Sequence, residues 1–277
     1  MTELSTVLSL SYAKFFGGFL LALLVAFIGW RMQALSSSGA WAAVISGALI
    51  FGLGGIPWAV LLLTFFVSSS ALSKAFSQRK RSMNEKFSKG SRRDWQQVFA
   101  NGGLGVLLVL LYFLFPEKDR IWIAYVGAMA AVNADTWATE VGVLSRTPPR
   151  LIITGEVVER GTSGGITPIG SLAAFLGGLL VSLVAAFLTP NIHLPLFILG
   201  GSLGGMAGAL VDSVLGASVQ GIYFCPSCLK ETERHPLHSC GTETNPLRGW
   251  RWVNNEVVNF SCSCVGAIAA VALWFLF

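Results

Sequence analysis

The sequence contains little charge. Only 12% of its 277 residues are Asp, Glu, Lys or Arg, whereas 53% are hydrophobic. A soluble domain has about 25% charged residues, so this scarcity excludes an ordinary soluble fold and indicates a membrane protein. The long apolar runs leave no room for a separate soluble domain, and we expect residues 1–277 to form a single integral membrane domain.

Two other features are missing. No basic segment precedes the first apolar run, which follows Glu3 and contains Lys14, so the pattern of a cleavable signal peptide is absent. The five cysteines are an odd number, which argues against a disulfide framework. The net charge of +5 does not indicate a nucleic-acid partner, because positive charge in membrane proteins collects in cytoplasmic loops.

The apolar runs predict seven or eight membrane spans, each near the ~20 residues that a helix needs to cross a bilayer. They cover about 8–30, 40–55, 57–77, 98–115, 121–144, 168–189, 195–219 and 255–277. The break at 54–57 is either a hairpin or a kink in one long helix, which leaves the count open. The predicted fold class is all-α, a polytopic transmembrane helical bundle.

Three long connections carry most of the positive charge. They are residues 78–97, 145–167 and 220–254, and with eight spans all three lie on one side of the membrane. By the positive-inside rule that side is the cytoplasm, and both termini then lie outside. We therefore expect a multi-pass protein of the plasma membrane or an internal membrane, with its polar side cytoplasmic; the sequence indicates no oligomeric state.

The fifth span contains polar side chains within its hydrophobic run. Asn133, Asp135 and Glu140 lie in the segment 133–140. A carboxylate near the middle of a membrane helix costs roughly 2.5–3.5 kcal/mol on insertion scales, so these acids need a compensating charge or a function.

Further acids lie on other spans. Asp212 and Ser213 fall in the seventh run, and Asn255 and Glu256 begin the eighth, all toward the predicted cytoplasmic side. Clustered carboxylates repel each other unless a cation joins them, and Mg²⁺ bound by these oxygens and a polyphosphate is one interpretation. Two others stay open: a proton or Na⁺ path in a transporter, and ion pairs with Arg146, Arg150 and Arg160.

A glycine-rich loop precedes the sixth span. Thr167 is a plausible N-cap and Pro168 a plausible first residue of the following helix. Free backbone N–H groups at a helix N-terminus can cradle a phosphate, although the Gly-Lys-Ser/Thr ending of a Walker P-loop is missing. A flexible turn is the alternative. The candidate phosphate-binding residues are Gly161, Thr162, Ser163, Gly164, Gly165 and Thr167.

The first long loop ends in basic residues, Lys89, Arg92 and Arg93, followed by Asn101 and two glycines just inside the fourth span. The basic residues alone are typical of an orientation signal beside anionic lipid head groups. The amide and the glycines indicate that the backbone approaches a ligand at the cytoplasmic mouth.

The third long loop contains a set of metal-ligating residue types. Cys225 and Cys228 form a Cys-x2-Cys pair, and His238 and Cys240 follow as His-x-Cys. Four such ligands at this spacing predict a zinc knuckle, with His235 as a substitute for His238 and free thiols as the alternative. Cys262 and Cys264 in the last span are interpreted as small apolar fillers.

Taken together, these motifs resemble those of the polytopic membrane family that contains the plant phytyl-phosphate kinase of the tocopherol pathway and uncharacterised bacterial, archaeal and animal members. Glu256 departs from the pattern, because an aspartate is expected there. The matching segments, in the family's order, are 93–102, 133–142, 161–167, 212–217 and 252–259.

The resemblance implies phosphorylation of a prenyl monophosphate to the diphosphate, with CTP as the expected donor. Under this hypothesis the cation is Mg²⁺, held by Asp135, Glu140 and Asp212. Phosphates are clamped by the glycine-rich loop and by Lys89, Arg92 and Arg93. The same hypothesis places further contacts to the nucleotide and its phosphates on Asn101, Asn133, Ser213, Asn255 and Glu256.

Two alternatives remain at this point. A cytidylyltransferase would use the same nucleotide, metal and lipid phosphate but attack the α-phosphate and release pyrophosphate. An ion-coupled transporter would use the buried acids for coupling and would turn over no nucleotide.

Overall fold

The computed structural model describes residues 2–80, 86–87, 89–90, 92–115, 118–189 and 194–276. This part of the chain forms eight helices, which confirms the predicted all-α bundle. They are α1 (Thr2–Arg31), α2 (Ser37–Gly54), α3 (Ile56–Lys80), α4 (Trp95–Leu114), α5 (Lys118–Gly142), α6 (Pro168–Phe187), α7 (Leu194–Ser218) and α8 (Asn255–Leu276).

Six of these helices are long and apolar enough to cross a membrane: α2, α3, α4, α6, α7 and α8. The apolar part of α1 is Phe15–Arg31. Helix α5 is 25 residues long, but it carries the acids of the 133–140 segment as well as Asp119 and Arg120, which lower its mean hydropathy. Every predicted span thus corresponds to a helix.

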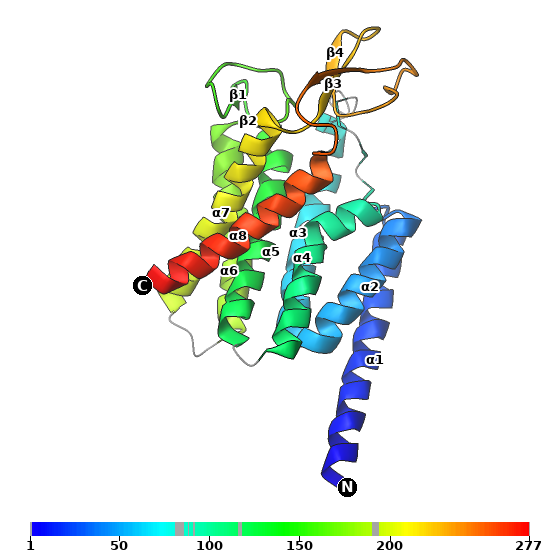
Figure 1. Ribbon diagram of the computed structural model, residues 1–277, viewed down its shortest axis with the longest axis vertical. Coiled ribbons are helices and arrows are strands. Elements are labelled where there is room, and N and C mark those ends of the chain that lie inside the picture. Colours follow the sequence, from blue (N-terminus) through cyan, green and yellow to red (C-terminus); the bar gives the residue numbers. More distant parts are fainter. Residues whose placement is uncertain are drawn as a thin grey trace.

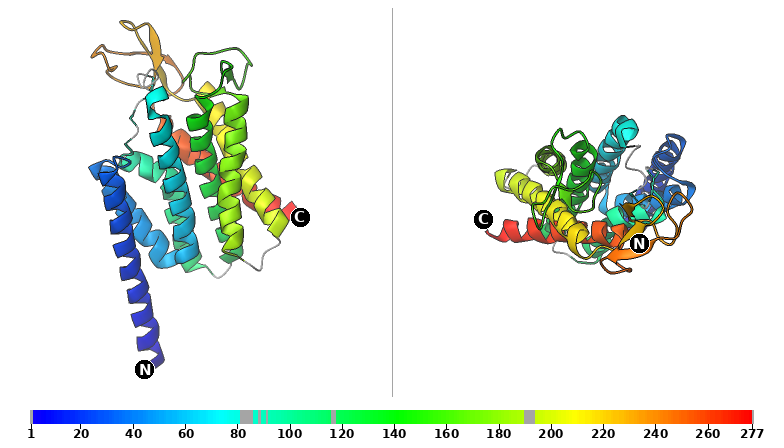
Figure 2. Two further views of the ribbon diagram at one scale, coloured as in Figure 1. Left: turned by 180° about the vertical axis from the view of Figure 1, so that it is seen from behind. Right: turned by 90° about the horizontal axis from the view of Figure 1, so that it is seen from above.

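The break between α2 and α3 is a hairpin, which makes the helix count eight. Gly55 separates the two helices and has a φ of +80°, a conformation that strains residues with a side chain. Figures 1 and 2 show α2 and α3 running in opposite directions from this turn.

The described parts of the three long connections lie at one end of the bundle, here termed the loop end (Figures 1 and 2). Helix α1 extends beyond the opposite end, and α8 starts at the loop end and crosses the bundle obliquely. The grouping of the long loops agrees with the arrangement predicted from their charge. The short connections at 116–117 and 190–193 lie outside the described residues.

Two small antiparallel sheets form in the long loops, where no strands were predicted from the sequence. The first pairs β1 (Arg150–Leu151) with β2 (Gly165–Ile166). The second has the order β4-β3-β5. Strands of two to four residues are too short for a period-2 pattern to reveal them. The second sheet comprises β3 (Ile222–Cys225), β4 (Lys230–Thr232) and β5 (Asn245–Arg248).

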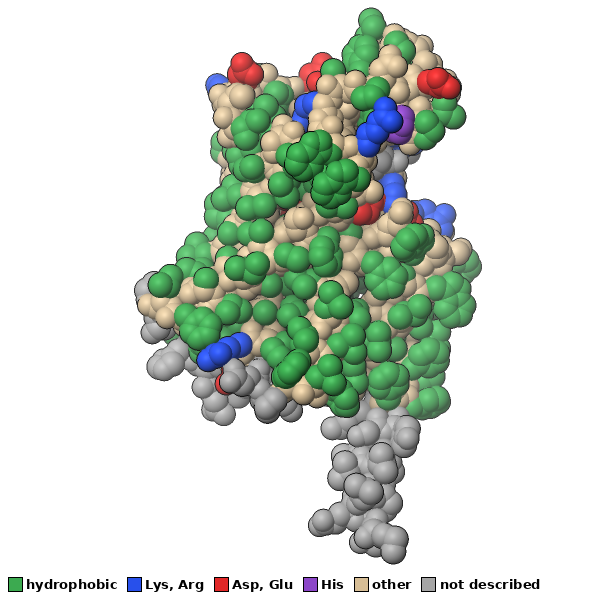
Figure 3. Space-filling view, viewed as in Figure 1, with side chains coloured by type: hydrophobic (Ala, Val, Ile, Leu, Met, Phe, Trp, Pro, Cys, Tyr) green, Lys and Arg blue, Asp and Glu red, His purple; other side chains and the backbone are tan. Residues whose placement is uncertain are grey.

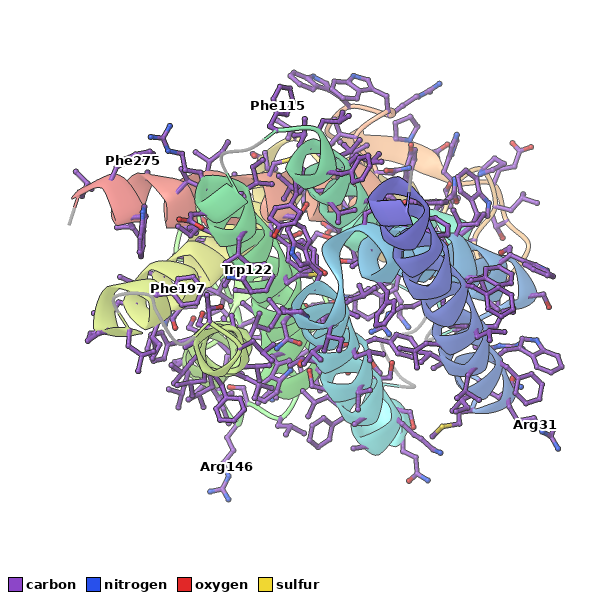
Figure 4. The ribbon with its side chains drawn as sticks, turned by 90° about the horizontal axis from the view of Figure 1, so that it is seen from below. Arg31, Phe115, Trp122, Arg146, Phe197 and Phe275 are labelled. Atoms are coloured by element: carbon purple, nitrogen blue, oxygen red, sulfur yellow. The ribbon has the colours of Figure 1, made fainter. Side chains whose placement is uncertain are left out.

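Helix α5 is the centre of the bundle and contacts α3, α4, α6, α7 and α8. Tyr125 and Met129 are fully buried, and the Tyr125 hydroxyl donates a 2.9 Å hydrogen bond to the Trp58 carbonyl of α3. Seen from below, Trp122 points into the bundle whereas Arg31 and Arg146 point outward (Figure 4). The motif on α5 therefore lies on the helix around which the others pack.

Small residues allow α5 to approach its neighbours closely. A Cβ atom added at Gly127 would collide with the backbone of Gly266 in α8, and one at Gly205 in α7 would lie 3.0 Å from Ala130. Such small-residue contacts are the usual means by which membrane helices gain packing energy.

The outer surface matches a bilayer environment. On the face in Figure 3, hydrophobic side chains cover the helical body, and most charged side chains gather toward the loop end. Phe187 is 88% exposed and Phe16 64% exposed. Large apolar side chains on the outside of an apolar helix are expected in lipid.

Candidate functional site

A cavity of about 360 Å³ opens at the loop end between α5, α6, α7 and the long connections. It collects most of the residues that the sequence singled out, although they are spread over more than 160 positions of the chain. The predicted residues that line it are Lys89, Arg93, Asn101, Asp135, Glu140, Gly161, Thr162, Ser163, Gly164, Gly165, Thr167, Asp212, Ser213 and Asn255.

Two carboxyl groups meet inside this cavity. Asp135 of α5 and Asp212 of α7 are hydrogen-bonded to each other, and the charge of Glu233 acts on Asp212 as well. The Asp212 Oδ2 atom is buried and has no hydrogen-bond partner among the described residues. Acids in this arrangement require a shared proton or a bound cation, and their oxygens are suited to a hard cation.

Glu140 of α5 lines the same cavity and has partners on α3 and in the first long loop. The Ser73 hydroxyl of α3 donates a 2.6 Å hydrogen bond to its Oε1 atom, and its charge acts on the guanidinium of Arg93. All three acids predicted as one metal set line the cavity, and they differ in the partners that they contact. Asp135 and Asp212 form the pair, and Glu140 belongs to the surroundings of Arg93.

Arg93 is held firmly at the edge of the cavity. Its guanidinium donates hydrogen bonds to the hydroxyls of Ser69 (2.9 Å) and Ser70 (2.8 Å). Its backbone N–H donates to the Ala34 carbonyl, and its own carbonyl accepts from the N–H of Ser36. Burial lowers the pKa of Arg93 to about 10, which still leaves it charged at neutral pH. The turn between α1 and α2 thus positions a residue of the site.

Lys89 is paired with two carboxylates. Its Nζ lies 2.7 Å from Asp94 and 2.6 Å from Glu256. Burial lowers the pKa of Lys89, but the two ion pairs outweigh burial and hold the pKa above its usual range. Burial likewise raises the pKa of Asp94, and the pairing with Lys89 and backbone N–H groups hold it below its usual range.

Three residues predicted to bind the nucleotide or its phosphates do not line the cavity. Arg92 is exposed and does not line the cavity. Glu256 does not line the cavity either, but it forms an ion pair with Lys89, which does. Asn133 is fully buried between helices: its amide nitrogen donates to the Gly177 carbonyl, and its oxygen accepts from the Ser68 hydroxyl, both at 2.8 Å. We therefore assign Asn133 to helix packing.

The glycine-rich loop has the predicted connection to a helix. Thr167 is the N-cap of α6, its hydroxyl accepts from the Gly170 N–H at 3.1 Å, and Pro168 is the first helical residue. Gly161 and Gly164 have φ values of +81° and +83°. A Cβ atom at Gly164 would also collide with Ala217 of α7. Glycine therefore avoids backbone strain at both positions and avoids a steric clash at position 164.

Three charged residues of the long loops that were not predicted to bind substrate also lie in the cavity or next to the glycine-rich loop. Glu233 accepts from the Ser163 hydroxyl at 2.9 Å and from Gln220 Nε2 at 3.0 Å. Arg248 donates to the last carbonyls of α7 and lies 3.4 Å from the Ser163 carbonyl. Arg160 lines the cavity and donates to the Val143 and Ser145 carbonyls. A charged residue in a polar loop has no pattern that distinguishes it from its neighbours.

The sequence left open that the buried acids form ion pairs with Arg146, Arg150 and Arg160. Only one of these three arginines, Arg160, lines the cavity. Arg146 is exposed and points away from the bundle (Figure 4), and the exposed Arg150 donates to the Gly155 carbonyl in its own loop.

The predicted zinc ligands Cys225, Cys228, His238 and Cys240 form a separate cluster in the third long loop, outside the cavity.

A second, apolar cavity of about 90 Å³ lies between α1, α2, α3 and α4. It shares three lining residues with the first cavity: Arg93, Gln97 and Asn101. The buried Ser46 hydroxyl lines it and has no hydrogen-bond partner among the described residues. The polar and apolar cavities thus adjoin at the start of α4.

The fold and the cavity define a polytopic integral membrane protein with an acidic, glycine-lined site at its loop end. The chain matches the family described as "Integral membrane protein DUF92" over residues 20–267, and it belongs to that family. The membership confirms the resemblance inferred from the motifs. No solved structure matches the chain.

Relatives are found in plants and archaea. Protein PGR of Arabidopsis thaliana is 34% identical over 262 residues, which are 86% of this chain and 88% of the relative. An uncharacterised membrane protein of Methanocaldococcus jannaschii is 34% identical over 263 residues, 94% of each chain. Protein VTE6, chloroplastic, of Arabidopsis thaliana is 25% identical over 251 residues, which are 87% of this chain and 66% of the relative.

Proposed function

We propose that this protein is a membrane-embedded prenyl-phosphate kinase. It transfers the γ-phosphoryl group of a nucleoside triphosphate, for which CTP is our expectation, to an isoprenoid monophosphate. Phytyl phosphate or a related prenyl phosphate is the acceptor class that the family resemblance implies. The loop end would face the cytoplasm, where the nucleotide is available.

The observation that carries this proposal is the contact between the two cavities. A lipid phosphate has an anionic head and a long apolar tail, so its site must be polar at one end and apolar at the other. Arg93, Gln97 and Asn101 line both cavities and stand at their junction. The acceptor phosphate would lie at this junction, with its tail among α1–α4 and the adjoining lipid.

The acidic pair fits a magnesium ion. Asp135 and Asp212 offer carboxylate oxygens from two helices, and the buried Asp212 Oδ2 atom has no hydrogen-bond partner among the described residues. Oxygen ligands from one or two carboxylates, completed by phosphates, are the usual environment of Mg²⁺. When bound, the ion supplies positive charge to the β- and γ-phosphates.

The chain's own residues orient the two substrates. The N-terminus of α6, which follows the loop 161–167, would present backbone N–H groups to the donor phosphates. Arg93 holds the acceptor phosphate, and Glu140 together with Ser69 and Ser70 keeps the guanidinium in place. Asn101 and Asn255 line the same cavity and would orient phosphate oxygens.

The transfer requires little further chemistry from the protein. An oxygen of the acceptor phosphate attacks the γ-phosphorus, a new P–O bond forms, and the bond to the β-phosphate oxygen breaks to release the nucleoside diphosphate. Because the acceptor oxygen is already anionic, no general base is required. The protein contributes alignment and charge neutralisation.

Ion-coupled transport would leave the adjoining apolar cavity and the glycine-rich loop without a role. Cytidylyl transfer would use the same groups at the α-phosphate, but the family resemblance favours γ-transfer.

The test is incubation of purified protein with a panel of nucleoside triphosphates and prenyl monophosphates of several chain lengths. We expect a prenyl diphosphate and a nucleoside diphosphate in equal amounts. Absence of any nucleotide turnover across the panel would overturn the proposal.

A further inference from the structure

The third long loop contains a cluster of four soft metal ligands. The Sγ atoms of Cys225, Cys228 and Cys240 and a ring nitrogen of His238 all lie within 4.8 Å of one another. The sulfurs of Cys225 and Cys240 are 3.6 Å apart, and His238 Nδ1 is 3.3 Å from the Cys240 sulfur. A tetrahedral zinc site with Zn–S bonds of about 2.3 Å separates its sulfurs by about 3.8 Å. The observed spacing is close to that value.

Two tight turns present these ligands in pairs. Cys225 ends strand β3, the Leu229 N–H donates to its carbonyl at 2.9 Å, and the Cys228 N–H points at its sulfur at 3.5 Å. On the other side, the His238 N–H donates to the Thr242 carbonyl at 2.9 Å. An N–H group directed at a ligand sulfur orients that ligand and tunes its charge.

The alternatives for these thiols fit less well. A disulfide requires sulfurs about 2.05 Å apart, and all three cysteines are free. His235, the substitute ligand considered from the sequence, stacks on Tyr223 with ring centroids 4.3 Å apart and contacts the Thr244 hydroxyl, so it is outside the cluster.

The segment around the cluster buries few apolar side chains. Its buried apolar side chains are Ile222, Tyr223, Cys225 and Val253. A segment of this size buries too little apolar surface to fix its shape, and small folds of this kind are usually stabilised by a metal or by disulfides. The three-stranded sheet lies beyond the helix ends at the loop end (Figure 1).

The same sheet holds the glycine-rich loop from two directions. Glu233 follows strand β4, and its carboxylate accepts from the Ser163 hydroxyl. Arg248 lies on strand β5, which pairs with β3, and its guanidinium approaches the Ser163 carbonyl. Glu233 is fixed in turn by its N–H, which donates to the Lys86 carbonyl at 2.8 Å.

We propose that this chain binds one zinc ion through Cys225, Cys228, His238 and Cys240. The ion fixes the β3–β4–β5 sheet and thereby clamps the glycine-rich loop at Ser163. This inference concerns a structural metal and stands independently of the kinase proposal.

The first test is metal analysis of the full chain purified in detergent without chelator. We expect about one zinc per chain, and cobalt reconstitution should give the absorption of thiolate-bound tetrahedral Co²⁺. Cys240→Ser, at an exposed position, should reduce the zinc content at least about fivefold. The control Cys264→Ser, in α8, should retain full zinc. Wild-type protein that holds no zinc and takes up no cobalt would overturn the proposal.

Hydrogen exchange tests the clamp separately. Removal of zinc should increase exchange in residues 220–250 and also in residues 161–165, whereas α2 should be unchanged. If hydrogen exchange in residues 161–165 does not change on zinc removal, the proposal that the β3–β4–β5 sheet holds the glycine-rich loop is wrong.

Discussion

Asp135 and Asp212 lie on different helices, α5 and α7, and their carboxyl groups are hydrogen-bonded to each other within the polar cavity. Two ionised carboxylates cannot share such a contact, so a proton or a cation must join them. We propose that Mg²⁺ does so during turnover.

Asp212→Asn tests the pair. The amide can hydrogen-bond to Asp135 without charge repulsion, so we expect the melting temperature in EDTA to rise by roughly 2–4 °C. Phosphoryl transfer should fall on the order of 100-fold or more because a cation ligand is lost. Thermal shift with and without Mg²⁺ and a product assay measure both effects.

The control for this variant is Asp119→Asn, an exposed acid in the first turn of α5 near the other end of the helix. Asp119→Asn should change neither the melting temperature in EDTA nor the rate of phosphoryl transfer. Equal stabilisation by Mg²⁺ of wild type and Asp212→Asn would contradict the assignment of the pair to the metal.

Arg93 and Arg92 are neighbours in sequence with different environments, and they form a matched pair of variants. Arg93→Gln removes the charge at the junction of the two cavities, and we expect KM for the prenyl phosphate to rise at least about tenfold, the cost of a hydrogen bond to a charged group. Arg92→Gln should leave KM unchanged because the side chain is exposed. Steady-state kinetics in detergent or nanodiscs measure KM for both variants. Equal effects of the two changes on KM would refute the proposed position of the acceptor phosphate.

Ser46 tests the apolar cavity. Ser46→Leu fills part of the cavity and removes a buried hydroxyl without a partner among the described residues, so thermal stability should be kept or increased. Affinity for long prenyl phosphates should fall at least about threefold, since the lost tail burial corresponds to roughly one methylene or more. KM for the nucleotide should not change. Ile45→Phe, at a position that is 52% exposed, is the control; the tail site is wrong if Ser46→Leu binds every acceptor normally.

Asn133→Ala should reduce stability rather than chemistry. The change leaves the Gly177 carbonyl and the Ser68 hydroxyl without their amide partner in the interior, at a cost of about 1–3 kcal/mol. Denaturation in detergent measures the loss, and turnover per folded molecule should stay within about twofold of wild type. As a control, Ser218→Ala removes an exposed hydroxyl that donates within its own helix. A fully stable but inactive Asn133→Ala protein would return this residue to the binding site.

The helices could be predicted because each is a run of apolar residues near the length of a bilayer crossing. The hairpin at Gly55 could not be decided from the sequence, since glycine permits both a turn and a kink. The sequence also indicated that the polar motifs meet, because they all fall in the long loops or in the halves of the spans next to those loops. The cavity brings most of them together for that reason.

The directions of individual side chains could not be predicted. Nothing in the sequence distinguishes Arg92 from Arg93, because the loop has no periodicity that assigns one of them to the interior. Asn133 lies one turn from Thr136 on α5, and its inward direction depends on contacts with α3 and α6. Glu233 enters the site from a loop whose path is set by the small sheet.

The most direct test of the central claim is the fate of the donor's phosphates in a single reaction. Purified protein is incubated with prenyl monophosphate and CTP that carries distinguishable labels at the α- and γ-phosphates. The account predicts that the γ-label appears in the prenyl diphosphate and that the α-label stays in CDP. Transfer of the α-label to the lipid with release of labelled pyrophosphate, or no turnover of any nucleoside triphosphate tested in the same way, would contradict it.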